Sequence, residues 1–136
     1  MIYTGKPPRA TMLYALEVPT LHGMTLGDTA FANTAAAWDG LPGEMRAHIE
    51  SLVGIFDFTT RKRSEPPDAA TIARYPPVRH PIVRTHPRTG RKGLYINRDD
   101  CTGIEGLDAA QAEALIVALS DHAVRPEYVY RHRWRV

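Results

Sequence analysis

Histidine and cysteine, the side chains that most often ligate metals or act as nucleophiles, are sparse here and lack catalytic spacing. The sequence has six histidines and one cysteine, and no His-x-His, His-x-Asp or His-Glu-x-x-His pattern occurs. His80 and His86 could reach one metal ion from adjacent turns, although no third ligand is evident. The alternative is that both bond to loop backbone around Pro81 and Pro87. Cys101 has no sequence cue for a nucleophile and is interpreted as a small, half-buried residue.

The stretch Gly27-Asp28-Thr29 is a candidate for ligand binding. A threonine hydroxyl just past a glycine loop can donate a hydrogen bond to a carboxylate or a phosphate. The alternative is an ordinary turn, because Asp and Thr after Gly commonly bond their own backbone. Neither a glycine-rich phosphate loop nor a G-x-S-x-G nucleophile elbow accompanies the stretch. From these residues alone both interpretations stay open.

The size and composition are those of one small globular domain. The chain has 136 residues and a mass of 15.2 kDa, with 43% apolar and 24% charged residues. No apolar run approaches the roughly 20 residues that span a bilayer. Residues 1–20 lack the basic start and apolar stretch of a secretory signal. The single cysteine excludes an internal disulfide. We therefore expect a cytoplasmic protein with no membrane partner.

The net charge of +2 hides an asymmetry between the two halves of the chain. Residues 1–60 carry three basic and six acidic side chains, whereas residues 61–136 carry fourteen basic and nine acidic ones. A basic half can indicate a nucleic-acid surface. The arginines are spread over several segments, however, and only Arg61-Lys62-Arg63 forms a run. Scattered, solvated side chains are therefore the favoured interpretation, and no nucleic-acid partner is predicted.

Hydrophobic periodicity predicts the elements that position these residues. Strands are predicted at residues 11–18, 29–33, 53–58 and 127–135, and a hairpin from residues 81–86 and 94–97. Helices are predicted at residues 34–38, 43–52 and 107–123, the last one capped by Asp108. Residues 61–79 read as a long loop with one helical turn near residues 69–73. The prediction is an α+β fold with helices packed on one side of short strands.

Four segments carry a combination of motifs that covers nearly the whole chain. They are Pro7-Pro8 followed by TMLYALEVP, then GDTAFANTAAAWDGLP, then HPIVRTHPRTGRKGLYIN, and then IEGLDAAQAEALIVALSDHAVRPEYVYRHRW. In this order they resemble the TauD/TfdA-like Fe(II)/2-oxoglutarate-dependent dioxygenases, the family of taurine dioxygenase and 2,4-dichlorophenoxyacetate dioxygenase.

The resemblance implies a double-stranded β-helix, or jelly roll, with helices on the outside. It implies oxidation of a small organic acid coupled to decarboxylation of 2-oxoglutarate. The family holds Fe(II) with two histidines and one carboxylate, which leaves coordination positions open. Of the family's cofactor contacts only Thr29 carries over, as a donor to the distal carboxylate of 2-oxoglutarate; the loop before it is longer than in the family. Asn97 and Phe58 lie near segments that face substrate in such enzymes.

The matched segments also predict a partial domain. In the family the His-x-Asp ligands precede the Pro-Pro segment, and the third iron ligand and the arginine that pairs with 2-oxoglutarate follow RHRW. Residues 1–136 are therefore expected to form a single, truncated dioxygenase-like domain with no catalytic or metal-ligating residue. Such a chain is expected to hold neither Fe(II) nor 2-oxoglutarate alone and to be inactive alone. The alternative is a non-catalytic remnant or interaction module that pairs, through exposed strand edges, with another copy or a complementing chain.

Overall fold

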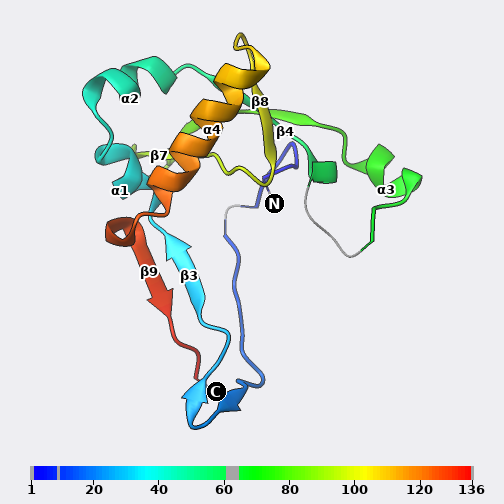
Figure 1. Ribbon diagram of the computed structural model, residues 1–136, viewed down its shortest axis with the longest axis vertical. Helices are drawn as coiled ribbons and strands as arrows, with labels where there is room; N and C mark the ends of the chain where they lie inside the picture. Colours follow the sequence, from blue (N-terminus) through cyan, green and yellow to red (C-terminus); the bar gives the residue numbers. More distant parts are fainter. Residues whose placement is uncertain (1, 9, 61–64, 136) are drawn as a thin grey trace.

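The computed structural model describes residues 2–8, 10–60 and 65–135, in which short strands and helices are mixed along the chain (Figure 1). The strands are β1 (Thr20–Leu21), β2 (Met24–Thr25), β3 (Thr29–Ala32), β4 (Val53–Phe56), β5 (Val78–Pro81), β6 (Val83–Thr85), β7 (Lys92–Leu94), β8 (Cys101–Ile104) and β9 (Val129–His132). The helices are α1 (Thr34–Asp39), α2 (Gly43–Ile49), α3 (Ala69–Arg74) and α4 (Ala109–Ala123), with short 3₁₀ turns η1 (Phe58–Thr60) and η2 (Pro126–Tyr128). The α+β prediction is confirmed. The Arg61-Lys62-Arg63 run lies outside the described residues.

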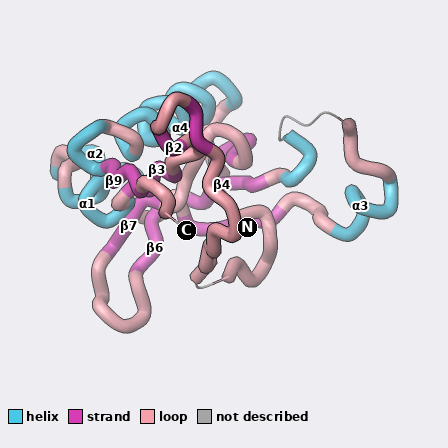
Figure 2. The backbone as a smooth tube through the Cα atoms, turned by 90° about the horizontal axis from the view of Figure 1, so that it is seen from below, coloured by secondary structure: helices cyan, strands magenta, loops and turns pink. Residues whose placement is uncertain are grey.

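The hydrophobic core surrounds a three-stranded antiparallel sheet in the order β5-β4-β8. Helix α4 packs against β8, and helix α1 packs against β7 of the neighbouring β6–β7 hairpin. The most deeply buried large apolar side chains come from several elements and loops: Ile49, Phe56, Ile82 and Leu119. Seen from below, α1, α2 and α4 gather on one side of the strands, while α3 lies apart at the far end (Figure 2). Burial of this apolar surface stabilises this part of the molecule, which comprises α1, α2, α4 and strands β4 to β8 and is called the body below.

Helix α4 forms because its sequence carries both a start signal and an apolar stripe. The Asp108 carboxylate accepts from the Gln111 backbone N–H at 2.9 Å, and the Gln111 side chain accepts from the Asp108 N–H, which makes a capping box. Ala112, Ile116 and Leu119 recur at helical spacing and are buried. The predicted helix and its cap are therefore confirmed. No helix in the described ranges is long and apolar enough to cross a bilayer.

Strands β3 and β9 form a separate two-stranded ribbon that extends from the body (Figure 1). They run antiparallel, with Thr29 opposite His132 and Ala32 opposite Val129. Asn33, directly after β3, caps α1 by accepting from the Ala36 N–H at 3.0 Å. The ribbon is therefore continuous with the body at one end only, where β3 leads into α1 and η2 leads into β9.

The predicted strand at residues 11–18 is wrong. These residues have no regular secondary structure, and Met12, Tyr14 and Leu16 are 93%, 86% and 78% exposed. Apolar alternation becomes a strand only where a neighbour pairs with the backbone. Within the described ranges no strand pairs with this segment. The alternation therefore marks an apolar face that no described element covers.

Three strand regions lie largely where no strand was predicted, and for β5 and β8 the reason is that their partner, β4, is distant in sequence. Strand β5 lies partly in the predicted loop at residues 61–79, directly after Pro76-Pro77, and the predicted helical turn in that loop is α3. Strand β8 pairs with β4, although it is short and interrupted by Gly103. The β1–β2 hairpin turns at His22 and Gly23, whose φ values of 49° and 77° are both positive, as a type I′ turn requires.

Gly54 in β4 provides a test of how tightly this core is packed. A Cβ at position 54 would lie 2.9 Å from Ile82 Cγ2 and 2.9 Å from Phe56 Cε2, and both of those side chains are fully buried. Gly54→Ala is expected to lower the free energy of unfolding by about 1–3 kcal/mol, measured by urea denaturation. Gly103→Ala in β8 is the matched control, because its nearest new neighbour is Ile55 Cδ1 at 3.6 Å. Equal losses from both substitutions would contradict the packing argument.

Candidate functional site

The Thr29 hydroxyl is held by a tryptophan from the other end of the chain. Trp134 Nε1 donates a hydrogen bond to Thr29 Oγ1 at 2.9 Å, across 105 residues of sequence. Thr29 opens strand β3 and follows Gly27, whose φ of 81° suits glycine and turns the chain into the strand. Thr29 and Trp134 are both half-buried. The contact therefore joins the start of β3 to the segment just past β9.

The β3–β9 register explains why these two residues meet. Directly opposed residues of an antiparallel pair project to the same face, and Thr29 is opposite His132. Residues two apart share a face, so Trp134 lies on that face as well. The His132 and Trp134 rings meet edge to face, with centroids 4.7 Å apart at 84°. The indole is thereby held against the ladder with its N–H on Thr29.

This hydrogen bond defines what the Thr29 hydroxyl can do next. An indole nitrogen is a donor only, so Thr29 Oγ1 is the acceptor in the contact. The hydroxyl keeps its own proton, and no side chain or backbone oxygen in the described part of the chain accepts it. Thr29 is therefore poised to donate to an incoming oxygen, and a carboxylate oxygen is a strong acceptor.

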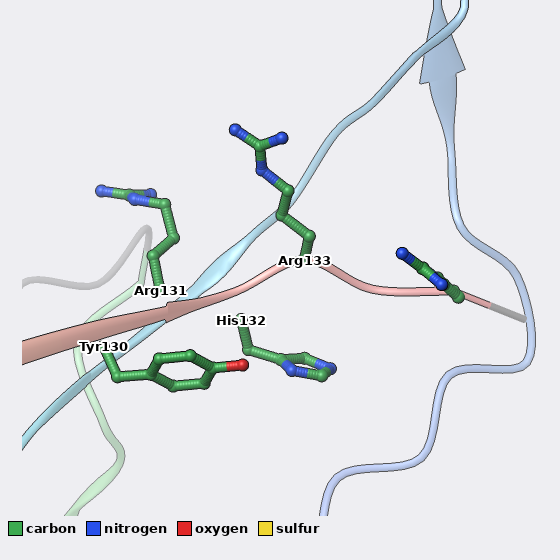
Figure 3. Close-up of a pocket in the computed structure, with 5 residues that line it drawn as sticks. Tyr130, Arg131, His132 and Arg133 are labelled. Carbon is green, nitrogen blue, oxygen red and sulfur yellow. The ribbon is translucent and has the colours of Figure 1, made fainter.

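The opposite face of the ribbon is basic. Arg131, Arg133 and Arg135 belong to this face, and together with Tyr130 and His132 from the Thr29 face they line an open cavity of about 470 Å³. Figure 3 shows Arg131 and Arg133 pointing to one side of the chain, and Tyr130 and His132 to the other. This positive charge favours anions along the ribbon.

Asp28 lies beside Thr29 and faces the arginine side of the ribbon. Its Oδ2 is 3.9 Å from Arg133 Nε, a loose ion pair, and its Oδ1 is buried with no hydrogen-bond partner in the described residues. A buried unpaired acceptor is costly, so Oδ1 is expected to bind a water molecule or another donor.

A second cavity of about 290 Å³ adjoins the Thr29–Trp134 contact. Its walls are mostly apolar and come from the irregular segment at residues 13–19 and from Leu26, Gly27 and Trp134, with Glu17 as the one charged residue. Trp134 therefore has two roles in the geometry, since its N–H binds Thr29 while its ring lines this cavity.

Four of the remaining basic side chains form ion pairs on the surface. Exposed pairs join Arg79 to Glu105, Arg91 to Asp39, Lys92 to Glu50 and Arg98 to Asp121. Each such pair contributes little to stability. Their scatter over the surface agrees with the interpretation of solvated charge rather than one continuous basic patch.

Cys101 is not a nucleophile in this fold. The side chain is 5% exposed, and burial raises the pKa of its thiol to about 11. The reactive form of cysteine is the thiolate, so the group stays protonated and inert near neutral pH. Cys101 is therefore a structural residue, as predicted, although it is buried rather than half-buried.

Comparison with known proteins decides the family. The family described as "Taurine catabolism dioxygenase TauD, TfdA family" matches residues 1–136. The chain belongs to the TauD/TfdA family. It is 35% identical over 140 residues to the alpha-ketoglutarate-dependent 2,4-dichlorophenoxyacetate dioxygenase of Cupriavidus pinatubonensis, a match that covers 94% of this chain and 44% of that protein.

Solved structures of TauD/TfdA-like proteins have the same fold over the matched region. The structure of AAD-2 in complex with Mn(II) and N-oxalylglycine is 32% identical, with a TM-score of 0.72, covering 81% of this chain and 44% of that one. A taurine dioxygenase from Burkholderia xenovorans is also 32% identical, with a TM-score of 0.66, covering 79% and 35%. The chain thus spans less than half the length of these TauD/TfdA relatives.

The described residues do not fit the iron site of the TauD/TfdA family. They contain no group of three or more His, Cys, Asp or Glu side chains that could hold a metal ion. His80 Nε2 donates to the Thr4 carbonyl at 2.9 Å, and His86 Nδ1 accepts from the Arg88 and Thr89 N–H groups at 3.3 Å. The predicted role is therefore confirmed for His86, which bonds backbone beside Pro87, whereas His80 bonds the distant Thr4 carbonyl rather than backbone around Pro81.

The other two predicted site residues lie in the body, apart from the start of β3. Asn97 Oδ1 accepts from the Asp99 and Asp100 N–H groups at 2.9 Å, which shapes the turn into β8. Phe58 lies in η1, and its ring centroid is 4.8 Å from that of Tyr3. The segments that carry these residues lie around β4 and β8, away from the ribbon (Figure 1). Their substrate-facing role stays a prediction.

Sequence reasoning placed Thr29 correctly at the start of a strand but missed Trp134. The one available signal was that Trp134 shares a face with Tyr130 and His132 at strand spacing. That signal does not reveal a partner 105 residues away, because the partner depends on the β3–β9 register.

Proposed function

We propose that this chain forms the central part of an Fe(II)/2-oxoglutarate-dependent dioxygenase domain that oxidises a small organic acid. Family membership supports the reaction class, and a relative named for 2,4-dichlorophenoxyacetate supports the substrate class. In the intact enzyme, Fe(II) and 2-oxoglutarate would activate O₂, which is the oxidant. The part of this chain is to bind and orient 2-oxoglutarate through Thr29 and to supply the helices that cover the outside of a jelly roll.

The observation that carries this proposal is the state of the Thr29 hydroxyl. Its oxygen already accepts from Trp134, and its proton has no acceptor in the described residues. Donation of that proton to the distal carboxylate of 2-oxoglutarate satisfies the hydroxyl completely. A hydrogen bond to a charged group contributes about 1.5–3 kcal/mol. One such contact orients a ligand but does not hold it tightly.

The side chains that ligate the metal ion would have to come from outside these residues. Because the described residues offer no three-ligand cluster, we place the two histidines and the carboxylate of the family's iron site outside this chain. The same placement applies to the arginine that pairs with 2-oxoglutarate. The apolar face of residues 11–18 and the β3–β9 ribbon would then form parts of a sheet completed by those segments.

An assay of succinate release tests this division of roles. The purified chain, given Fe(II), 2-oxoglutarate, ascorbate and 2,4-dichlorophenoxyacetate, is expected to release no succinate above a metal-free blank, because the metal ligands are absent. The 2,4-dichlorophenoxyacetate dioxygenase of Cupriavidus pinatubonensis, assayed in parallel, is the positive control. Metal-dependent succinate release by this chain alone would contradict the proposal.

A second candidate function is an interaction module, and the exposed apolar side chains favour it. Met12, Tyr14 and Leu16 are exposed along one segment, and Phe31 and Tyr130 are 48% and 66% exposed on the ribbon. In the described residues each ribbon strand pairs only with the other, so each has one open edge. Open edges beside apolar surface favour pairing with another strand. The partner would be a second copy or a chain that complements this one.

The mass of the chain in solution tests the interaction module. Light scattering after size exclusion is expected to give a mass above the 15.2 kDa of one chain, and Leu16→Lys is expected to shift the protein toward monomer by charging the apolar segment. Val117→Lys is the control, because Val117 is an exposed residue of α4, away from the ribbon. A folded parent chain that elutes only as a monomer would rule out self-association.

A further inference from the structure

We infer that Trp134 is a positioning residue for Thr29: its indole N–H fixes the Thr29 hydroxyl so that the hydroxyl proton points outward to a ligand carboxylate. The inference rests on the proposed function, in which Thr29 contacts 2-oxoglutarate. It adds a residue on the far strand whose side chain need not touch the ligand at all.

The first step of the argument is chemical. A free threonine hydroxyl can rotate and can bond to nearby backbone as donor or acceptor. Here the indole N–H, which can only donate, occupies one lone pair of Oγ1 at 2.9 Å. The hydroxyl then gains a further hydrogen bond most readily by donating its own proton. A threonine hydroxyl can donate or accept, and the bond from Trp134 uses part of its capacity to accept. The hydroxyl is therefore favoured as a donor, which is what a carboxylate oxygen needs.

The second step is mechanical, because a neighbouring ring packs against one side of the Trp134 indole. The His132 ring packs edge to face on the indole at 4.7 Å, and His132 is in register with Thr29. On the other side the indole lines the cavity next to Leu26 and Gly27. Phenylalanine can occupy much of the same space without the N–H, so Trp134→Phe removes the hydrogen bond while keeping most of the packing.

The first experiment examines the contact without ligand, by NMR of the labelled chain. The chain has two tryptophans, so Trp134→Phe assigns the two indole N–H signals. Thr29→Val is expected to move the Trp134 indole signal toward the position of an unbonded indole, whereas Thr29→Ser retains it. Trp134→Phe is expected to average the Thr29 χ1 couplings over several rotamers. The inference would be overturned if the Trp134 indole signal did not move in Thr29→Val, or if the Thr29 χ1 couplings were unchanged in Trp134→Phe.

The second experiment follows the Ala30 amide while 2-oxoglutarate is added up to ~50 mM, a concentration at which one hydrogen bond to a charged group gives a measurable response although the chain alone does not hold the ligand tightly. Loss of one positioning hydrogen bond is expected to weaken the response roughly three- to tenfold in Trp134→Phe. In the Thr29→Val background, Trp134→Phe is expected to cause no further loss, because Trp134 acts through Thr29. Phe31→Leu is the matched control, since Phe31 is an exposed aromatic residue of the same face and lines neither cavity. Equal losses in both backgrounds would overturn the inference.

The two experiments separate failure of the inference from failure of the proposed function. A parent chain that responds to 2-oxoglutarate, with Trp134→Phe responding equally, removes only the positioning role. A parent chain with no response removes the proposed carboxylate contact of Thr29, while the indole signal still shows whether Trp134 fixes the hydroxyl.

Discussion

The pairing of β3 with β9 is the interaction on which the candidate site depends. The ladder joins residues about a hundred positions apart and sets Thr29 opposite His132. A shift of the register by one residue would turn the side chains of β9 to the opposite face. Trp134 would then face away from Thr29, and the arginines would take its place. The chemistry of the hydroxyl is therefore a consequence of backbone pairing.

The body fixes the ribbon at its inner end. The Asn33 N–H donates to the Tyr128 carbonyl at 2.8 Å, which closes the ladder where α1 begins. His122, near the end of α4, donates from Nε2 to the Ala37 carbonyl at 2.8 Å, and its ring packs on Tyr128. A Cβ at Gly40 would lie 2.0 Å from the Tyr128 hydroxyl, so only glycine leaves room for that side chain. The core thus positions the ribbon through η2 and α1.

Helix signals were predictable from the sequence, and most strand pairings were not. Helix α4 could be predicted because the residues of its capping box and of its apolar stripe lie within a few positions of each other in the sequence. Residues 11–18 have an equally clear strand pattern, yet they form no strand, because a strand needs a partner and none of the described segments provides one. The same reason explains why β8 and the Trp134 contact were missed. Thr29 could be found only because a family motif marks it, since a turn explains the same three residues locally.

The central claim is that this chain presents the 2-oxoglutarate contact and not the metal site. Mn(II), the ion in the AAD-2 complex with N-oxalylglycine, tests it directly, because a bound paramagnetic ion broadens nearby NMR signals. With N-oxalylglycine present, the account predicts that substoichiometric Mn(II) leaves the signals of Thr29 and the Trp134 indole no broader than those of the rest of the chain. Selective loss of these two signals would place a metal ion beside them, held by this chain alone, and would contradict the account.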